Sequence, residues 1–148
     1  MSVPFKDRKQ CKDCLAESGY SMRPAPHPGP RCFTHHHARK KALKALSHER
    51  RVVDVYGLLP GEYERLLAFQ GGVCAICARP PVTKRLAVDH DHSCCPGKTS
   101  CGECVRGLVC GPDNSYLAHI RDNVNRAMNL LAYLQNPPAK RMRSHESR

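Results

Sequence analysis

The sequence contains no tryptophan, and aromatic residues of all kinds make up only 5% of its 148 residues. Twelve prolines and ten glycines interrupt the chain. With so few large apolar side chains, we do not expect one extensive hydrophobic core to supply most of the stability. Ten cysteines are present instead. They predict that cross-links, either disulfides or metal ions, help to hold the fold together.

The sequence also lacks long apolar runs. Its first residues, MSVPFKDRKQCKDC, are charged and contain no apolar stretch typical of a secretory signal. No run approaches the roughly 18 residues that a membrane-spanning helix needs. We therefore expect a cytoplasmic protein without a membrane partner. Because thiols stay reduced in the cytosol, the cysteines are expected to bind zinc rather than to form disulfides.

Acidic residues are scarce relative to basic ones. The chain has 13 Asp and Glu against 24 Lys and Arg, a formal net charge of +11. Such an excess attracts polyanions, and nucleic acid is the most common of these. The alternative is a basic surface that only keeps the protein in solution. The charge therefore favours a nucleic-acid partner but does not establish one.

Residues 1–37 form a head that is rich in cysteine and histidine. Two pairs of potential ligands, each separated by two residues, stand on either side of a proline-rich stretch at 23–32. This spacing is typical of a tetrahedral zinc site. The predicted ligands are Cys11, Cys14, Cys32 and His35, with His36 as an alternative to His35. The competing interpretation is a solvated histidine tract beside free thiols.

The rest of the chain divides by composition into three further parts. Residues 38–72 are expected to form a basic linker helix over 38–56 and a short helix within 58–72. The basic helix either lies along a phosphate backbone or faces only water. Residues 73–135 contain the densest motifs and end in a helix over 115–135, capped by Asn114 or Ser115. The tail, 136–148, is expected to be disordered and basic.

Within 73–114, ligand pairs stand on both sides of a predicted strand. Cys74 and Cys77 precede the stretch KRLAVDHDH, which ends in Asp89 and His90. A cysteine-rich loop follows, and then VRGLVCGPDN with Cys110. A zinc ion held by these three cysteines and a fourth group would join the hairpin to the start of the last helix. It would also bring Asp89, His90 and Asn114 close to one another.

Those three side chains suit phosphodiester hydrolysis. Asp89 and Asn114 offer the hard oxygen ligands that Mg²⁺ or Mn²⁺ prefers. His90 can accept a proton from water near neutral pH. A metal ion on the phosphate and a water activated by histidine make a phosphodiesterase. The same four letters, DHDH, standing alone would more often form a polar turn.

From Tyr56 to Leu134 the sequence resembles the recombination endonuclease VII branch of the HNH, or ββα-metal, nucleases. The matching pieces are YGLLPGEYERLLAFQGGVCAICARPP, LAVDHDH, VRGLVC and Asn114. The head, CKDC…RCFTHH, resembles the zinc knuckle that precedes this domain in some phage and actinobacterial members. The resemblance therefore covers roughly half the chain and extends in part to its head.

The resemblance implies an α+β fold: a small zinc-stabilised ββα-metal core with helical extensions and an N-terminal zinc knuckle. It implies a divalent-metal-dependent DNA endonuclease that nicks or resolves branched DNA in a bacterial or phage-infected cell. Asp89 and Asn114 match the metal ligands, His90 matches the general base, and His92 matches a further active-site position. The structural zinc ligands of the family match Cys74, Cys77 and Cys110. A homodimer is left open, as are the DNA target and its sequence.

One position departs from the family pattern, because Asp113 stands where a second cysteine of the last pair is expected. Aspartate can itself bind zinc, so a Cys₃Asp site is the preferred interpretation. Otherwise a cysteine of the 94–104 loop supplies the fourth ligand, or the site is weakened and the nuclease inactive. The loop cysteines are also candidates for a further zinc site, which allows one to three zinc ions in all: Cys94, Cys95, Cys101 and Cys104.

Two other classes of function remain open from the sequence. A catalytically inactive, zinc-stabilised DNA-binding protein would explain the charge and the departure at Asp113. A structural zinc protein that binds a partner chain would explain the zinc ligands alone. Neither has a use for Asp89, His90 and Asn114 together, so the endonuclease is the preferred prediction.

Overall fold

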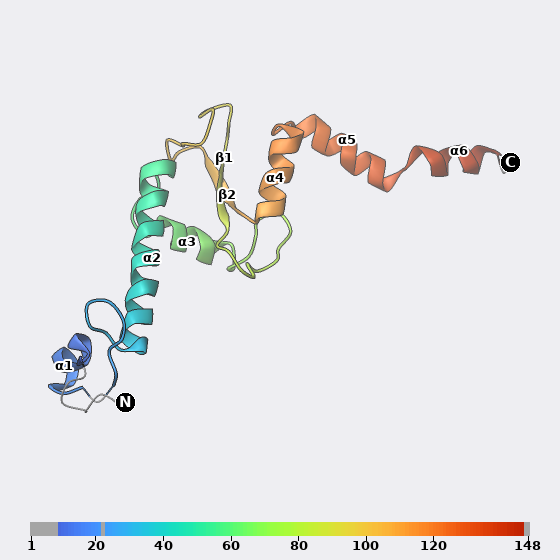
Figure 1. The fold of residues 1–148 in the computed structure, drawn as a ribbon. Helices are drawn as coiled ribbons and strands as arrows, with labels where there is room; N and C mark the ends of the chain where they lie inside the picture. The colour runs from blue at the N-terminus through green and yellow to red at the C-terminus, as the bar shows by residue number, and fades with distance from the viewer. Residues whose placement is uncertain (1–8, 22, 147–148) are drawn as a thin grey trace. The chain divides into compact units, whose positions relative to one another are not determined.

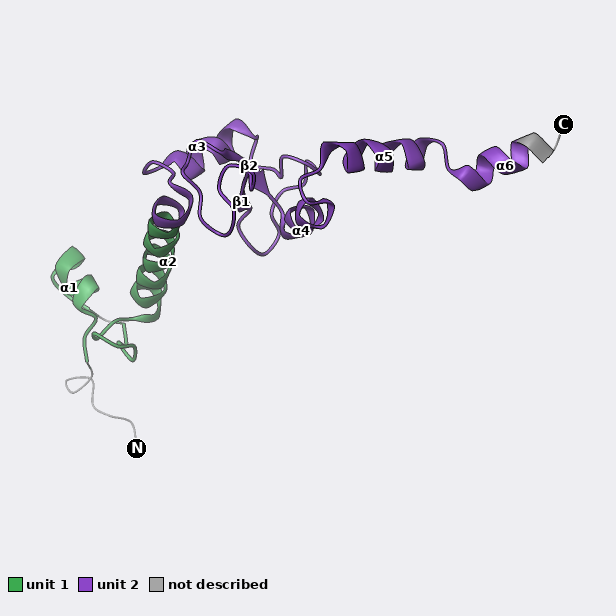
Figure 2. Cartoon of the chain, turned by 90° about the horizontal axis from the view of Figure 1, so that it is seen from above, with its two compact units in different colours: residues 1–51 green, residues 52–148 purple. Residues whose placement is uncertain are grey.

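The computed structural model describes residues 9–146, with the exception of Met22. Residues 1–8 of the predicted head and 147–148 of the predicted tail lie outside the described residues. Within the described part, no helix is both long and apolar enough to cross a membrane. The chain forms two compact units, residues 1–51 and 52–148 (Figure 2).

Helices and a two-stranded sheet make up the chain, which confirms the predicted α+β class (Figure 1). The elements in order are α1 (Lys12–Ser18), α2 (Phe33–Tyr56), α3 (Glu62–Phe69), β1 (Ala87–His90), β2 (Val105–Val109), α4 (Gly111–Ile120), α5 (Val124–Gln135) and α6 (Pro138–Glu146).

The first unit is built around cysteines rather than large apolar side chains. Its buried cluster consists of Cys11, Ala25 and Cys32, with Cys14 packed against it. Arg31 donates from Nε to Asp13 at 2.7 Å and ties the proline-rich loop to α1. So small an apolar cluster offers little burial energy, which is the condition under which small domains depend on metal cross-links.

Helix α2 begins five residues before the predicted basic helix, at Phe33 instead of residue 38. The three consecutive histidines therefore lie in its first turns. Ala, Leu, Lys, Arg and Glu, all strong helix formers, fill half of its 24 residues. Only its last turn reaches the second unit, where Val52 is buried.

The core of the second unit lies between α3, the hairpin and the end of α2. Its buried members are Val52, Leu58, Tyr63, Cys74, Leu86, Val88, Leu108 and Val109. The Tyr63 hydroxyl donates to the Leu86 carbonyl at 2.9 Å. The Gln70 side chain bonds both the N–H and the carbonyl of Leu108, at 2.8 and 2.9 Å. These contacts fix the hairpin on α3.

The antiparallel pair of β1 and β2 contains an irregularity beside Asp89. The partners are Val88 with Leu108, Asp89 with Gly107, and His90 with Val105. Arg106 is thus the extra residue of β2. In a regular strand Asp89 and His90 would point to opposite faces, yet both are buried here. A bulge re-aims the side chain of its extra residue, here Arg106, and Arg106 contacts the buried Asp89.

The helix predicted over residues 115–135 is wrong, because two helices occupy this part of the chain. Helix α4 ends at Ile120, and Arg121 and Asp122 follow with φ values of +54° and +52°. Asn123 then caps α5, accepting the Arg126 N–H at 3.0 Å. Residues other than glycine with positive φ are uncommon, and the apolar periodicity continues through this break. The sequence pattern therefore did not indicate that the helix ends here.

The start of that helix also differs from the prediction. Cys110, and neither Asn114 nor Ser115, is the N-cap of α4. Pro112 lies in the first turn, where its missing N–H costs nothing because that group would have no helical partner. Gly111 and Pro112 favoured a turn from sequence alone. As a result, Asn114 lies within the first turns of the helix, half-buried.

The tail, for which the composition predicted disorder, forms helix α6 over Pro138–Glu146. Its first residue is a proline, a favoured first helical position. Helix propensity comes from Ala139, Lys140, Arg141, Met142 and Arg143. Basic composition was therefore an incomplete guide to the structure of this segment.

Candidate active site and zinc centres

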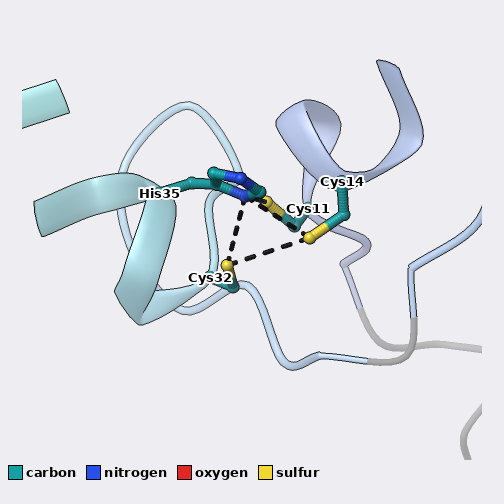
Figure 3. Close-up of side chains that lie close together, drawn as sticks. All are labelled: Cys11, Cys14, Cys32 and His35. Carbon is teal, nitrogen blue, oxygen red and sulfur yellow. Dashed lines mark hydrogen bonds between the residues drawn. The ribbon is translucent and has the colours of Figure 1, made fainter. Parts of the chain in front are cut away.

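The structure brings together the four residues predicted as the zinc ligands of the head, which we call the head cluster: Cys11, Cys14, Cys32 and His35 (Figure 3). Their ligand atoms all lie within 4.8 Å of one another. The His35 Nδ1 atom is 3.3 to 3.4 Å from the three sulfurs. The other ring nitrogen lies 3.1 Å from the Glu17 carboxylate, which would fix the tautomer of a metal-bound ring.

His36, the alternative ligand, points elsewhere. Its ring stacks on His27 with 4.2 Å between the ring centroids. Among the described residues, His35 is the histidine that joins the three cysteines.

The thiols of the head cluster have very different proton affinities without a metal ion. Burial alone would raise the pKa of Cys11, but hydrogen bonds from the Cys14 and Cys32 backbone and from His35 lower it to about 6. Burial and the neighbouring sulfurs raise the pKa of Cys14 to about 11. One thiol of the cluster therefore loses its proton easily, whereas the loss of a proton from a second thiol is opposed by burial and by the neighbouring sulfurs. A divalent cation removes that opposition, so the donor set fits zinc.

A second group, the core cluster, joins the hairpin to α4: Cys74, Cys77, Cys110 and Asp113. One carboxylate oxygen of Asp113 lies 3.1 Å from the sulfurs of both Cys74 and Cys110. Hydrogen bonds from the Cys77, Cys110 and Cys74 thiols lower the pKa of Asp113. Aspartate therefore occupies the fourth position, and the cysteines of the 94–104 loop gather elsewhere. The Cys₃Asp set fits zinc.

A third group, the loop cluster, lies between the two strands: Cys94, Cys95, Cys101 and Cys104. Two of its members, Cys94 and Cys95, are adjacent in the sequence. The four sulfurs nevertheless lie within 4.8 Å of one another. The Ser100 hydroxyl lies 3.2 Å from the Cys104 sulfur. All three clusters are thus able to hold structural zinc.

His90 lies at the end of β1 with only 4% of its surface exposed. Its Nε2 atom is 3.2 Å from the carbonyl oxygen of Cys95. A carbonyl oxygen can only accept, so this contact places the imidazole proton on Nε2. The Nδ1 lone pair is then available as an acceptor. The His92 and Tyr56 rings lie 4.6 and 6.3 Å away, measured between centroids.

Asp89 is buried and already paired with a cation. Arg106 contacts both of its carboxylate oxygens, from Nε at 2.8 Å and from Nη2 at 3.0 Å. Arg106 also reaches Asp122 at 2.9 Å, and Asp122 in turn contacts Nδ1 of His92 at 2.9 Å. We call these four residues the Arg106 network: Asp89, Arg106, Asp122 and His92.

Sequence reasoning missed two members of this network. Arg106 was assigned no role, because exposed arginines are common and the bulge that turns it toward Asp89 leaves no sequence signal. Asp122 lies in the unexpected break between α4 and α5. Burial alone would raise the pKa of Asp122, but hydrogen bonds from His92 and Arg106 outweigh it and lower the pKa.

Asp89 and Arg106 line a hollow of about 240 Å³ together with Leu117 of α4. Helix α4 packs against β1. Asn114 lies in this helix but is not among the residues that line the hollow. In the described part of the chain, no hydrogen bond engages the Asn114 side chain. The structure thus gathers Asp89, His90 and His92 at one end of β1 and places Asn114 on the neighbouring helix.

The fold and the site define a small α+β protein with three cysteine clusters suited to zinc and a buried Asp-His pair at a strand end. Residues 49–136 match the family described as recombination endonuclease VII. The chain belongs to that family, which confirms the resemblance seen in the sequence. Family membership implies a nuclease, a hydrolase whose substrate is DNA.

Two similar proteins come from mycobacterial phages. The gene 59 proteins of Mycobacterium phages D29 and L5 are each 44% identical over 134 residues. The matches cover 89% of this chain and 76% and 77% of the two relatives. No solved structure matches the chain.

Proposed function

We propose that the protein is a divalent-metal-dependent DNA endonuclease of the HNH type, with β1, β2 and α4 as its ββα-metal core. His90 acts as the general base in phosphodiester hydrolysis, and the enzyme nicks or resolves branched DNA. The observation that carries the proposal is the contact between His90 Nε2 and the Cys95 carbonyl. It leaves Nδ1 as the proton acceptor of a buried ring.

The position of His90 suits a base. A neutral imidazole near physiological pH can take a proton from a water molecule within hydrogen-bond reach of its free nitrogen. The Cys95 carbonyl holds the ring in one tautomer, so no reorientation is needed before each proton transfer. Such positioning is a large part of what a general base contributes.

Asp89 and Asn114 fit the binding of Mg²⁺ or Mn²⁺ through their oxygens. Asp89 is a buried carboxylate that is paired with the Arg106 guanidinium, and a metal ion bound to it would replace that cation. The Asn114 side chain has no competing partner among the described residues. When bound, the metal ion would neutralise charge on the phosphate and on the leaving oxygen.

Arg106 and His92 are proposed to support phosphate binding. Arg106 keeps a second carboxylate partner, Asp122, whether or not Asp89 turns to a metal ion. Its guanidinium therefore stays near the site, with donors suited to phosphate oxygens. Asp122 orients His92 through Nδ1 and leaves Nε2 free to face a ligand.

Zinc in the three clusters is proposed to hold shape and to take no part in the chemistry. The basic charge of the chain, +11, would hold DNA through its phosphates. Phosphate contacts position the protein on DNA but carry no sequence information.

A second candidate is an inactive DNA-binding protein. Asp113 in place of the expected cysteine favours it, as does the occupation of Asp89 by Arg106. The two candidates differ in whether His90 is needed to cleave DNA or whether the protein only binds it.

The test compares wild type with His90→Ala on supercoiled plasmid and on a four-way junction, with Mg²⁺ or Mn²⁺. Loss of a general base is expected to lower the cleavage rate about 10²- to 10⁴-fold. His119→Ala, an exposed histidine of α4, is the matched control and should cleave like wild type. All three proteins need equal zinc content and equal DNA binding. A folded, zinc-loaded wild type that binds DNA but never cuts it would establish the second candidate instead.

A further inference from the structure

The segment between the strands, residues 91–104, packs differently from the rest of the second unit. None of its residues belongs to the buried hydrophobic core of that unit, among those described. Its own turns hold it only locally: the Asp91 carbonyl accepts from the Cys94 and Cys95 N–H groups at 3.2 and 3.1 Å. Apolar burial therefore cannot account for its shape.

Besides the His92–Asp122 ion pair and the contact of the Cys95 carbonyl with His90, backbone contacts at Ser100 and Gly102 attach this segment to the unit. The Ser100 N–H donates to the Val55 carbonyl at 2.9 Å. The Gly57 and Gly102 backbones approach so closely that a Cβ on Gly102 would lie 2.5 Å from the Gly57 oxygen. Both glycines have positive φ, +66° and +91°, and leave room for this approach. The loop is thus anchored near both ends, by His92 at its start and by Ser100 and Gly102 toward its end, and the sulfur cluster joins the two parts.

Cys95 takes part in two arrangements at once. Its sulfur belongs to the loop cluster, and its carbonyl oxygen faces Nε2 of His90 at 3.2 Å. A bond from the sulfur to a metal ion would fix the peptide that follows it. Cys95 is half-buried and outside the hydrophobic core, so a metal bond to its sulfur would add to the hydrogen bond of its N–H with Asp91 in holding this carbonyl in place.

We infer that a zinc ion held by Cys94, Cys95, Cys101 and Cys104 positions His90 through the Cys95 carbonyl. The loop zinc is a positioning element for the base, and the fold does not depend on it. In this it differs from the core cluster, whose Cys74 is itself a member of the hydrophobic core. The inference rests on the proposed role of His90, but the loop zinc and the hydrogen bond between His90 and the Cys95 carbonyl can be measured without DNA.

The test uses the full chain with Cys101→Ser and, separately, Cys94→Ser, both at exposed positions. Neither residue contacts His90. Thr99→Ala, exposed in the same loop, is the matched control. Each cysteine variant is expected to bind one zinc ion fewer than wild type, with an unchanged circular dichroism spectrum. The single-turnover cleavage rate at saturating protein is expected to fall about 10- to 100-fold, the scale of a misplacement of about 1 Å.

A second readout separates positioning from activity. In ¹⁵N-histidine spectra, His90 of wild type and of Thr99→Ala should show a protonated Nε2 and an unprotonated Nδ1. The Cys101→Ser and Cys94→Ser variants should show an average of the two tautomers. His90→Ala identifies the signal by its loss.

Three results would overturn the inference. The zinc content could be unchanged in both cysteine variants, the His90 tautomer could be unchanged after zinc loss, or the whole unit could unfold in both. If wild type proves unable to cleave DNA, the proposed function fails, while zinc content and tautomer still decide the role of the loop.

Discussion

At the residue scale, Arg106 determines the electrostatic surroundings of Asp89. The carboxylate has 5% of its surface exposed and would be costly to bury alone. Two hydrogen bonds from one guanidinium balance its charge, and the bulge in β2 makes this approach feasible. A metal ion at Asp89 would therefore compete with a cation that is already there.

Replacing Arg106 with Gln should destabilise the metal-free protein and make divalent cations more stabilising. The buried Asp89 loses its partner, which costs about 1–3 kcal/mol, toward the lower end because Arg106 is itself partly exposed. The measurement is urea unfolding with and without Mg²⁺. Arg85→Gln is the control, because it breaks an exposed ion pair with Glu64 and should cost below about 1 kcal/mol. Equal losses in the two variants, or no added effect of Mg²⁺, would contradict this account of Asp89.

At the element scale, the short ligand spacings were the most readable part of the sequence. Each cluster contains at least one pair of ligands separated by two residues, so the local chain already brings ligands together. The first strand of the hairpin was predictable for a different local reason, because an apolar run leads directly into the polar residues at the end of β1. The choice of His35 over His36 as the ligand could not be predicted from the sequence, since it depends on how α2 and the proline-rich loop fold together.

The features that the sequence did not reveal arise from long-range or backbone effects. The bulge that aims Arg106 at Asp89 depends on strand register. The break at Arg121 and Asp122 depends on left-handed residues inside a continuous apolar pattern. The network that joins these positions was therefore invisible before the structure.

After a chelator removes zinc, two thiols of the 91–104 loop are expected to react at different rates. The hydrogen bond with Ser100 is the main cause that lowers the pKa of Cys104, to about 7, whereas neighbouring thiols raise the pKa of Cys94 to about 12. Because the thiolate is the reactive form, Cys104 should react with iodoacetamide faster than Cys94 at pH 7.5. Its rate should rise through about pH 7, where the thiol loses its proton. Mass spectrometry of the labelled peptides measures both rates.

Exposure alone predicts the opposite order, because Cys94 is exposed and Cys104 only half-buried. Ser100→Ala serves as the control, since losing the hydroxyl should raise the pKa of Cys104 and slow its labelling. Faster labelling of Cys94 in the chelated protein would show that these electrostatics do not govern the loop.

At the scale of the whole molecule, cysteine clusters suited to zinc accompany an apolar core that the composition keeps small. Each of the two units contains at least one cluster, and two of the three residues in the buried cluster of the first are cysteines. The proposed enzyme thus separates two uses of metal. Zinc would hold the framework, and a second, hard cation would act at Asp89 and Asn114.

The central claim is metal-dependent cleavage of DNA by this chain, and one assay tests it most directly. Wild-type protein, loaded with zinc and freed of other metals, is incubated with a radiolabelled four-way junction and with a linear duplex of the same arm sequences. We expect no cleavage without added metal. With about 5 mM Mg²⁺ or Mn²⁺ we expect strand cleavage, and the junction should be cut faster than the duplex. Cleavage that persists without a divalent cation would contradict it, as would binding of both DNAs with neither cut.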